Sequence, residues 1–315
     1  MSERSSVVDG TNYPNLDALL ALQYSVTPQH RRYLEARMGE ANGDFAFLET
    51  LSTQILALGG ERMREICANY DFICSIVREE EIYFRRNGNY RLTTFEEANR
   101  LVYSDKAFMG RYMDGLLLTQ VYWSNHSASY AFYKNEFLAK AVEGYDYLEI
   151  GPGHGLLLYQ AISDDRNGSV SGWDVSKTSI EQTFEALETL GLHGKKVDLA
   201  LRDLYAPRQD EKLFDCVTFS EVLEHLEKPQ LALESLLQIL KPGGRLYVNV
   251  PINSPAPDHL YLLRSPDEVL DAIRTAGFEI ETSAFYPMTN HTMAQALKHR
   301  LTISACVIAR RPVKD

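Results

Sequence analysis

The chain has 315 residues, enough for one large or two ordinary domains, and its 45% hydrophobic and 24% charged residues are typical of a soluble globular protein. The formal net charge of −11 argues against a nucleic-acid partner, which needs a basic surface, and no apolar run is long enough to cross a membrane. The four scattered cysteines show no metal-binding spacing and the first residues contain no apolar signal-peptide core, so we expect a cytoplasmic protein.

The first part of the chain is predicted to be mainly helical. Apolar residues recur at helical spacing on one face of residues 16–23, 31–37, 45–58 and 62–76. Gly59 and Gly60 end the third of these segments, as glycines commonly do after helices. Residues 16–23 and 45–58 carry apolar faces that a small helical domain does not obviously need for its own core.

The spacing of apolar residues changes at residues 82–93. Two short β-prone runs flank Asn87-Gly88-Asn89, and an Asn-Gly pair between such runs predicts a β-hairpin. Thr94 is then expected to cap a further helix. Helices followed by a hairpin are typical of a winged-helix domain. A winged helix that reads DNA is the rival interpretation, but the acidic total and the lack of a Lys/Arg cluster on its helices argue against it.

Residues 108–139 form a long, aromatic-rich helical stretch. It carries more apolar surface than one linking helix needs, so we expect most of its aromatic residues to pack two domains together and some to line a pocket.

The chain is organised around residues 145–155, which read YDYLEIGPGHG. A short strand runs into a glycine turn, and a helix opens at Leu156. The glycines allow a tight turn and let a ligand lie against the backbone. The spacing is G-x-G-x-G, and Glu149 precedes it, so a carboxylate would repel a pyrophosphate but suit an amino group or ribose hydroxyls. A tight turn without a ligand is the alternative.

The C-terminal part alternates strands and helices. Strands are predicted at residues 147–150, 170–173, 197–201, 216–219, 245–250, 279–283 and 302–309, with helices that begin near Leu156, Thr178, Gln230 and Ser265. This alternation predicts a mostly parallel sheet with helices on both faces, and ligands at the carboxyl ends of its strands.

The run E-I-G-P-G-H-G resembles motif I of the class I S-adenosylmethionine-dependent methyltransferases. The resemblance continues through roughly the C-terminal half of the chain, in Gly172-Trp173-Asp174, Arg202-Asp203-Leu204, Phe214-Asp215-Cys216-Val217, Glu221 to His225 and Leu240-Lys241-Pro242-Gly243-Gly244. It implies an α/β Rossmann-like sheet that is mostly parallel with one antiparallel strand.

The run R-N-G-N-Y-R-L-T resembles the wing in the N-terminal domain of small-molecule O-methyltransferases. In those enzymes this domain forms a dimer and one wall of the substrate pocket. The resemblance implies a winged-helix-like dimerisation and substrate domain at residues 1–105, linking helices over the active site at 106–140, and a cofactor-binding domain at 141–315. We therefore expect a homodimer.

The methyltransferase resemblance also implies roles for individual residues. The methionine part of S-adenosylmethionine would lie against Glu149, Gly151, Gly153 and Gly155. Asp174, followed by Val175, would accept the ribose hydroxyls, although a strand-end Asp could instead be a helix cap. The remaining cofactor-binding residues are Asp203 and Leu204 at the adenine, Ser220 near the sulfonium, and Tyr133 from the segment that closes over the cofactor.

Histidine and carboxylate residues follow the fourth and fifth predicted strands. His225 and His259 are candidate general bases with Glu221 beside them, and either histidine could instead be structural. In a helix, Glu221, Glu224 and His225 would converge on one face, with Asp258 and His259 on the same rim of the sheet. Such a set could bind Mg²⁺, Mn²⁺, Fe²⁺ or Zn²⁺. It resembles the metal-binding set of the small-RNA 2′-O-methyltransferases, and its first run also resembles the ubiquinone O-methyltransferases, but many related enzymes carry the same run without a metal.

The predicted function is direct SN2 transfer of a methyl group from S-adenosylmethionine to an O or N atom of a small molecule such as a secondary metabolite, leaving S-adenosylhomocysteine. Tyr122, His126 and Tyr130 are the candidate substrate residues. The rival hypothesis is a non-catalytic winged-helix regulator or cofactor-binding protein with a vestigial methyltransferase fold.

Overall fold

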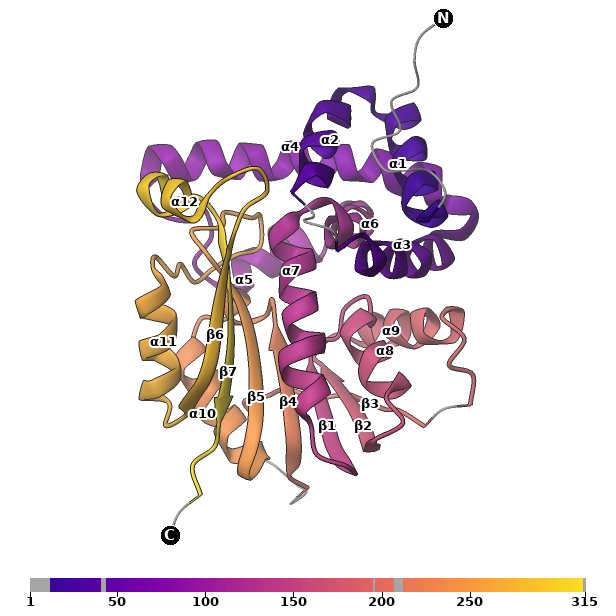
Figure 1. Cartoon of the computed structure of the whole chain (residues 1–315). Helices are drawn as coiled ribbons and strands as arrows, with labels where there is room; N and C mark the ends of the chain where they lie inside the picture. The colour runs from indigo at the N-terminus through magenta and orange to yellow at the C-terminus, as the bar shows by residue number, and fades with distance from the viewer. Residues whose placement is uncertain (1–11, 41–43, 195, 207–211, 314–315) are drawn as a thin grey trace, which may run out of the picture.

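The computed structural model describes residues 12–40, 44–194, 196–206 and 212–313, and shows helices stacked on one end of a sheet that has helices on both of its faces (Figure 1). The sheet is seven-stranded in the order β3-β2-β1-β4-β5-β7-β6. All the strand predictions overlap the observed strands, which are β1 (Tyr145–Ile150), β2 (Asn167–Asp174), β3 (Asp198–Leu201), β4 (Phe214–Ser220), β5 (Leu240–Ile252), β6 (Glu279–Pro287) and β7 (Ile303–Arg310).

The strand directions agree with the predicted fold class. β1, β2, β3, β4 and β5 pair in parallel, whereas β7 is antiparallel to both β5 and β6. The chain leaves β1 toward β2 on one side, and β4 pairs with β1 on the other. This reversal is the kind of switch point beside which parallel sheets bind ligands.

Alternating side chains of the strands enter two apolar cores. Tyr147, Cys216 and Tyr247 pack on one face against α7 and α8. Leu148 and Val217 point to the other face, where α10 and α11 cover the sheet. The helices of this part are α8 (Leu156–Ser163), α9 (Lys177–Thr189), α10 (Pro229–Ile239), α11 (Pro266–Thr275) and α12 (Met293–His299), and the first four begin within one residue of the predicted starts.

The apolar core on the α7 face of the sheet continues into the N-terminal helices. Leu16 and Leu19 of the first helix and Leu48 and Ile55 of the third are almost fully buried within the single chain. We expected a homodimer partly because a single chain does not obviously need these apolar faces. Since the faces are buried within the chain, they give no support for a dimer, and the homodimer stays a prediction. The elements are α1 (Pro14–Val26), α2 (Arg31–Gly39), α3 (Phe45–Gly59), α4 (Met63–Asn87), α5 (Phe95–Ala98), a π-helical turn (Asn99–Tyr103) and α6 (Lys106–Tyr122).

The predicted wing hairpin is wrong. Residues 82–85 lie inside the 25-residue helix α4, and residues 90–93 belong to no strand. The Asn-Gly pair ends this helix instead: Gly88 has a φ of 74° and donates its N–H to the Phe84 carbonyl oxygen at 2.7 Å. Buried Tyr70, Ile73 and Phe84 lie on one helical stripe, and its burial outweighs the local β preference of Ile82 and Tyr83. Thr94 does cap α5, as predicted, by accepting the Glu97 N–H at 3.3 Å.

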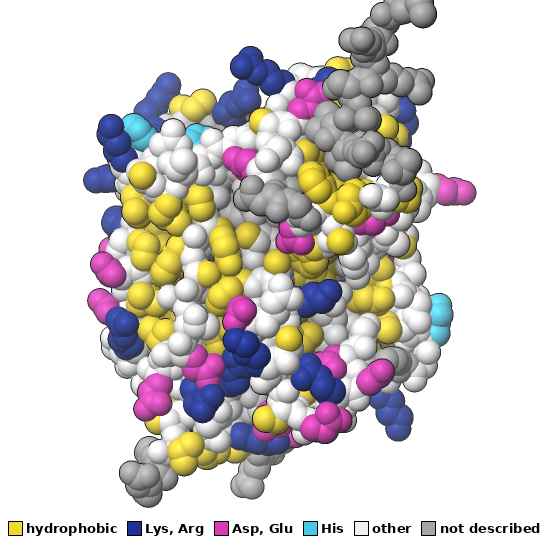
Figure 2. Space-filling model, viewed as in Figure 1, with side chains coloured by type: hydrophobic (Ala, Val, Ile, Leu, Met, Phe, Trp, Pro, Cys, Tyr) yellow, Lys and Arg dark blue, Asp and Glu magenta, His cyan; other side chains and the backbone are white. Residues whose placement is uncertain are grey.

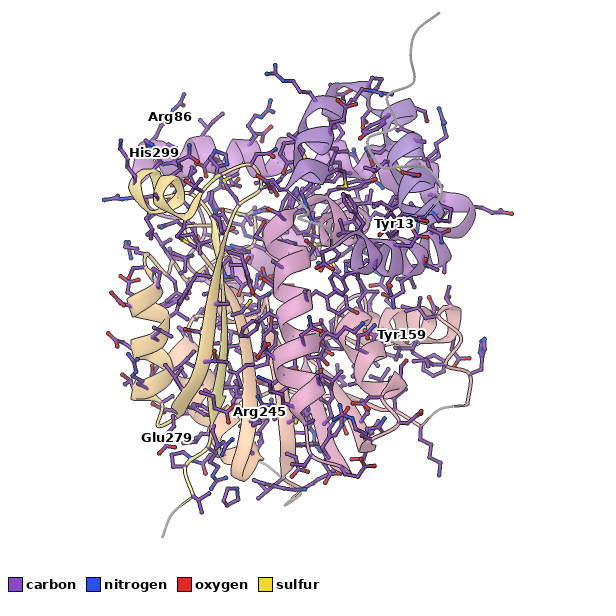
Figure 3. The ribbon with its side chains drawn as sticks, in the orientation of Figure 1. Tyr13, Arg86, Tyr159, Arg245, Glu279 and His299 are labelled. Carbon is purple, nitrogen blue, oxygen red and sulfur yellow. The ribbon has the colours of Figure 1, made fainter. Side chains whose placement is uncertain are left out.

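The segment at 106–140 divides between the two parts of the molecule. α6 packs on α4, whereas α7 (Ser124–Phe132) and a π-helical turn (Tyr133–Phe137) lie along one face of the sheet (Figure 1). The far end of α4 also meets the C-terminal part, because Arg85 donates to the carbonyl oxygens of His299 and Arg300, and Figure 3 shows His299 beside Arg86.

The visible surface is chemically mixed. On the face in Figure 2, apolar side chains gather across the middle, and most Lys, Arg, Asp and Glu side chains lie around the edges and over the lower part. Among the described residues, no helix has the length and apolarity needed to cross a membrane.

Candidate active site

The glycine turn has the geometry that its sequence predicts. Gly151, Gly153 and Gly155 have φ values of 67°, 51° and 73°, in the left-handed region that favours glycine. A Cβ atom on Gly153 would meet nothing within 4 Å, so its surface is open to a ligand. From α6, the Met113 carbonyl oxygen lies 2.8 Å from the Nε2 atom of His154 in this turn. The N-terminal helices therefore reach the carboxyl ends of the strands.

Glu149 is a buried carboxyl group at the end of β1, with only 3% of its surface exposed. The Tyr147 hydroxyl donates to its Oε2 atom at 3.3 Å, and the Tyr133 hydroxyl donates to Tyr147 at 2.9 Å. Burial raises the pKa of Glu149 to about 8. Tyr133, a predicted cofactor residue, thus acts on Glu149 through Tyr147, a link that the sequence did not reveal.

Asp174 ends β2 beside the same turn. Its Oδ1 atom accepts the Ser176 N–H at 2.8 Å, and burial raises the pKa of its carboxyl group. The cap of α9 is Ser176, which accepts the Ser179 N–H at 3.2 Å. Asp174 is therefore not the capping residue itself. Val175, next to it, is 64% exposed.

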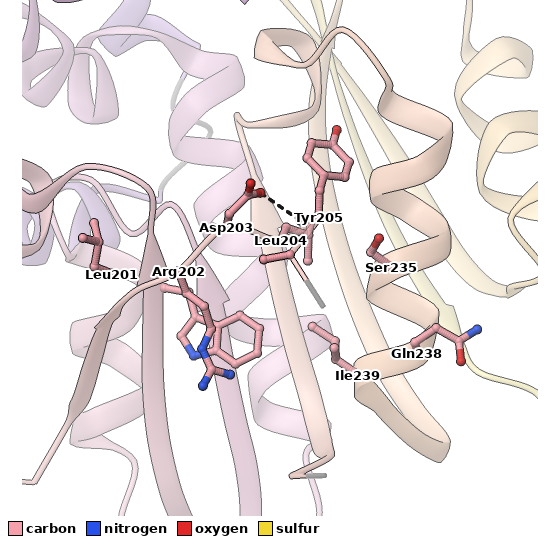
Figure 4. Close-up of a pocket in the computed structure, with 10 residues that line it drawn as sticks. Leu201, Arg202, Asp203, Leu204, Tyr205, Ser235, Gln238 and Ile239 are labelled. Atoms are coloured by element: carbon pink, nitrogen blue, oxygen red, sulfur yellow. Dashed lines mark hydrogen bonds between the residues drawn. The ribbon is translucent and has the colours of Figure 1, made fainter. Parts of the chain in front are cut away.

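Asp203 and Leu204 follow β3 and line a pocket of about 490 Å³ (Figure 4). Asp203 accepts the Tyr205 N–H at 2.9 Å, and the Tyr205 hydroxyl donates to the Lys228 carbonyl oxygen at the start of α10. The rest of the lining comes from the α10 face of the sheet and includes Trp173 and Ile239. None of the histidines or glutamates after β4 lines this pocket, so it adjoins the predicted adenine position rather than the candidate catalytic groups.

Ser220 and Glu221 lie where β4 ends. Asn249 of β5 donates through Nδ2 to the Ser220 hydroxyl at 3.1 Å and to Glu221 Oε1 at 2.9 Å. Burial raises the pKa of Glu221 to about 7. The prediction that this run begins a regular helix is wrong, because Glu221 has a φ of 54° and only Leu223–His225 form a short 3₁₀ turn.

Glu224, His225 and His259 nevertheless converge, because two loops are joined rather than because of helical spacing. The Glu224 carbonyl oxygen accepts the N–H groups of Leu260 and Tyr261 at 2.8 and 2.9 Å. The Nε2 atoms of His225 and His259 lie 3.7 and 4.0 Å from Glu224 Oε1. One potential ligand atom from each of the three residues lies within 4.8 Å of the others.

The histidine tautomers of this cluster suit a divalent cation. The Nδ1 atom of His225 lies 3.1 Å from the Asp258 carbonyl oxygen and that of His259 lies 2.6 Å from the Ser254 carbonyl oxygen. A carbonyl can only accept, so each Nδ1 carries the proton and each Nε2 keeps a lone pair. In the described part of the chain both Glu224 carboxyl oxygens are buried without a hydrogen-bond partner. Burial, and then the charge of Glu221, raises the pKa of Glu224 well above its ordinary value. Two free imidazole nitrogens and an unsatisfied carboxyl group fit a metal ion.

The sequence missed two tyrosines at this end of the site. The Tyr103 hydroxyl lies 3.3 Å from His225 Nδ1 and 3.4 Å from Asp258 Oδ2. The Tyr112 hydroxyl donates to Asp258 Oδ1 at 3.4 Å. Both lie far from the strand motifs in sequence, and no residue spacing connects them to Asp258. The tyrosines of residues 108–139 were expected at a pocket, but nothing distinguished Tyr112 among them.

Of the three candidate substrate residues, Tyr122 and Tyr130 are buried and His126 is half-buried, and each makes packing contacts. The Tyr122 hydroxyl donates to the Leu19 carbonyl oxygen at 3.4 Å, and its ring packs on Tyr70. His126 Nδ1 lies 2.9 Å from the Thr119 hydroxyl, and burial lowers the pKa of its ring to about 4. The Tyr130 hydroxyl donates to the Leu156 carbonyl oxygen at 2.7 Å, at the start of α8. Tyr130 is thus hydrogen-bonded to the segment that follows the glycine turn.

Comparison with known proteins agrees with this geometry. The family model "Methyltransferase domain" matches residues 122–300, more than half of the chain. The ubiquinone biosynthesis O-methyltransferase of Coxiella burnetii is 28% identical over 133 residues, 42% of this chain and 54% of the relative. The enzyme of that name from a Chelativorans species is 35% identical over 111 residues, 35% of this chain and 42% of the relative.

The chain thus spans about half the length of the curated relatives that it matches. Among solved structures, the N-methyltransferase NodS from Bradyrhizobium japonicum in complex with S-adenosyl-L-homocysteine is 17% identical, with a TM-score of 0.45 over 59% of this chain and 86% of the other. That likeness is too low to bear on function. From the match over residues 122–300, the chain belongs to the methyltransferase-domain family, and it has the fold of the class I S-adenosylmethionine-dependent methyltransferases.

Proposed function

We propose that this protein transfers a methyl group from S-adenosylmethionine to an oxygen or nitrogen atom of a small molecule. One observation carries the proposal: Glu149 ends β1 beside the open glycine turn, and the Glu224, His225 and His259 cluster follows β4 and β5, the next strands on the same rim. A ligand-binding end and a reactive end therefore adjoin at the switch point of the sheet.

The chain offers a complementary surface for the methyl donor. Glu149, once ionised, would pair with the ammonium group of the methionine part. Asp174 keeps carboxyl lone pairs for the ribose hydroxyls, although Oδ1 already accepts the Ser176 N–H. Asp203 and Leu204 would flank the adenine beside the pocket in Figure 4. Bound there, S-adenosylmethionine supplies a methyl group already activated by a sulfonium.

The remaining work of the chain is to orient the acceptor and take its proton. A lone pair of the acceptor forms the new bond to the methyl carbon while the S–CH₃ electron pair passes to sulfur, and the acceptor proton leaves to a base. His225 and His259 each present an unprotonated Nε2 atom next to Glu224. Burial, and then the charge of His225, lowers the pKa of His259 to about 4, which makes it a poor base at neutral pH but a ready metal ligand. We therefore assign His225 as the base if no metal takes part.

A metal-assisted form of the reaction is the second candidate. Glu224, His225 and His259 would hold a divalent cation, which would bind an acceptor hydroxyl and lower its pKa. The unsatisfied carboxyl oxygens of Glu224 favour this version. Glu221 lies outside this cluster and accepts a hydrogen bond from Asn249. Its carboxylate would add a second negative charge near the cation.

The acceptor is proposed to be a small molecule, and oxygen is favoured because the matched relatives are named O-methyltransferases. A role in secondary metabolism and a cytoplasmic location remain parts of the proposal. The winged-helix part of the rival hypothesis loses its motif, because residues 82–87 lie in α4 and residues 90–93 form no strand. A non-catalytic cofactor-binding protein stays the alternative.

Isothermal titration with S-adenosylhomocysteine tests the proposal. We expect saturable 1:1 binding, and transfer of labelled methyl from S-adenosylmethionine to a panel of phenols and catechols. Transfer should be compared before and after chelation, with metal content measured by elemental analysis. No binding of S-adenosylhomocysteine would contradict the proposed function, whereas full transfer by metal-free protein would contradict only its metal-assisted form.

A further inference from the structure

We infer that Tyr103 is a positioning residue of the acceptor end of the site, which holds the His225 ring so that its Nε2 atom faces Glu224. The acceptor role of this end of the site rests on the proposed function, whereas the test of Tyr103 does not depend on methyl transfer. The Tyr103 hydroxyl contacts both His225 Nδ1 and the Asp258 carboxyl group, at 3.3 and 3.4 Å.

The hydrogen-bond directions around His225 follow from its neighbours. The Asp258 carbonyl oxygen at 3.1 Å and the Asp258 Oδ2 atom at 3.5 Å can only accept from Nδ1–H. The Tyr103 hydroxyl donates to Asp258 Oδ2 and is a second acceptor for the same His225 Nδ1–H group, which it shares with the Asp258 carbonyl oxygen. The arrangement favours the Nδ1–H tautomer and leaves the Nε2 lone pair toward Glu224.

The local structure explains why Tyr103 reaches this position. It ends the π-helical turn Asn99–Tyr103, and such turns are frequent at functional sites. Val102, next to it, packs in an apolar cluster with Leu92, Ala98 and Leu260. The Phe95 N–H donates to Glu227 Oε1 at 2.6 Å. The segment is thus anchored to both loops that carry the histidines.

Tyr112 makes the arrangement two-sided. The Tyr112 hydroxyl donates to Asp258 Oδ1, the carboxyl oxygen that Tyr103 does not contact. The Asp258 residue is 5% exposed. Loss of the Tyr103 hydroxyl would therefore remove the donor to Asp258 Oδ2 and one acceptor near the His225 Nδ1–H group. The bond from Tyr112 to Asp258 and the contact of His225 with the Asp258 carbonyl oxygen would stay in place. We expect a partial loss of order rather than collapse of the site.

The test is Tyr103→Phe, which keeps the ring, with Tyr83→Phe as its matched control. Tyr83 is a half-exposed residue of α4 whose ring lies under Arg91, a contact that phenylalanine retains. Long-range ¹H–¹⁵N NMR spectra report the tautomer of each histidine, and a His225→Gln spectrum identifies the His225 signals. We expect only the Nδ1–H tautomer of His225 in the wild type and in the control, and a measurable Nε2–H population in Tyr103→Phe.

An unchanged His225 signal in Tyr103→Phe, or an Nε2–H tautomer in the wild type, would overturn the inference. S-adenosylhomocysteine affinity should stay within about twofold in every variant, because Tyr103 lies at the acceptor end. Where the wild type binds Co²⁺, its affinity should fall by roughly 10- to 100-fold in Tyr103→Phe, as is usual for residues that orient a ligand. Failure of the wild type to bind S-adenosylhomocysteine would contradict the proposed function, and the tautomer result would still decide the role of Tyr103.

Discussion

The two ends of the candidate site are built in different ways. At the end formed by β1 and β2, Glu149, the glycine turn and Asp174 all belong to one strand–helix–strand unit. At the end formed by β4 and β5, His225 and His259 come from two loops, and Tyr103 and Tyr112 come from the N-terminal helices. The first end depends on local chain geometry, and the second depends on contacts between distant parts of the sequence.

This difference separates binding from turnover. Substitutions at the first end should weaken binding of S-adenosylmethionine, since we propose that this end holds the methyl donor. Substitutions at the second end should lower turnover and leave cofactor binding intact. Each prediction below sharpens or breaks that separation.

The largest effect is expected from His225→Ala. Loss of the Nε2 atom removes the proposed proton acceptor, or a ligand of the metal, and should lower turnover by roughly 10²- to 10⁴-fold. S-adenosylhomocysteine affinity, measured by titration calorimetry, should be nearly unchanged. A variant that loses both turnover and cofactor binding would show that the two ends are not independent.

Asp174→Ala should weaken S-adenosylhomocysteine binding by at least about tenfold, because two charge-assisted hydrogen bonds to the ribose, each about 1.5–3 kcal/mol, would be lost. The control is Asp198→Ala, at an exposed position of the neighbouring strand β3. Circular dichroism should confirm that both variants are folded. If Asp174→Ala binds S-adenosylhomocysteine as tightly as the wild type, Asp174 does not contact the ribose and has only a structural role, through its hydrogen bond from the Ser176 N–H.

Glu149 should make the unliganded protein sensitive to pH. Its pKa is raised from 4.5 to about 8 in the folded state, so its contribution to stability is fully present below pH 4.5 and is lost as the pH rises through 8. Glu149→Gln should therefore melt at a higher temperature than the wild type above pH 8, and the difference should shrink toward pH 5. Differential scanning calorimetry at several pH values measures this. An equal difference at all pH values would contradict burial of an ionisable group at this end.

The smallest effect is expected from Tyr122→Phe. The hydroxyl bonds the Leu19 carbonyl oxygen within the helical core, so its loss should lower the free energy of unfolding by about 0.5–1.5 kcal/mol. Turnover and cofactor affinity should not change. Denaturant unfolding and methyl-transfer assays measure both properties, and a large loss of turnover without a loss of stability would instead support a substrate role for Tyr122.

The sequence could predict the local parts of this protein. Strand positions followed from alternating βα units, and the glycine turn from residues that allow a positive φ. The placement of Glu149 and Asp174 followed as well, because parallel strands bring their carboxyl ends to one rim. Each of these features depends on residues close together in the chain.

Only the tertiary structure decided the rest. Residues 82–85 look like a strand in isolation but become helical, because they continue α4, whose stripe of Tyr70, Ile73 and Phe84 is buried. The Glu224, His225 and His259 cluster forms without the predicted helix, through a carbonyl that joins two loops. Tyr103 reaches His225 across more than a hundred residues of sequence. Local spacing encodes backbone conformation, but it carries no information about which distant side chains will share a buried site, since that is set by packing of the whole chain.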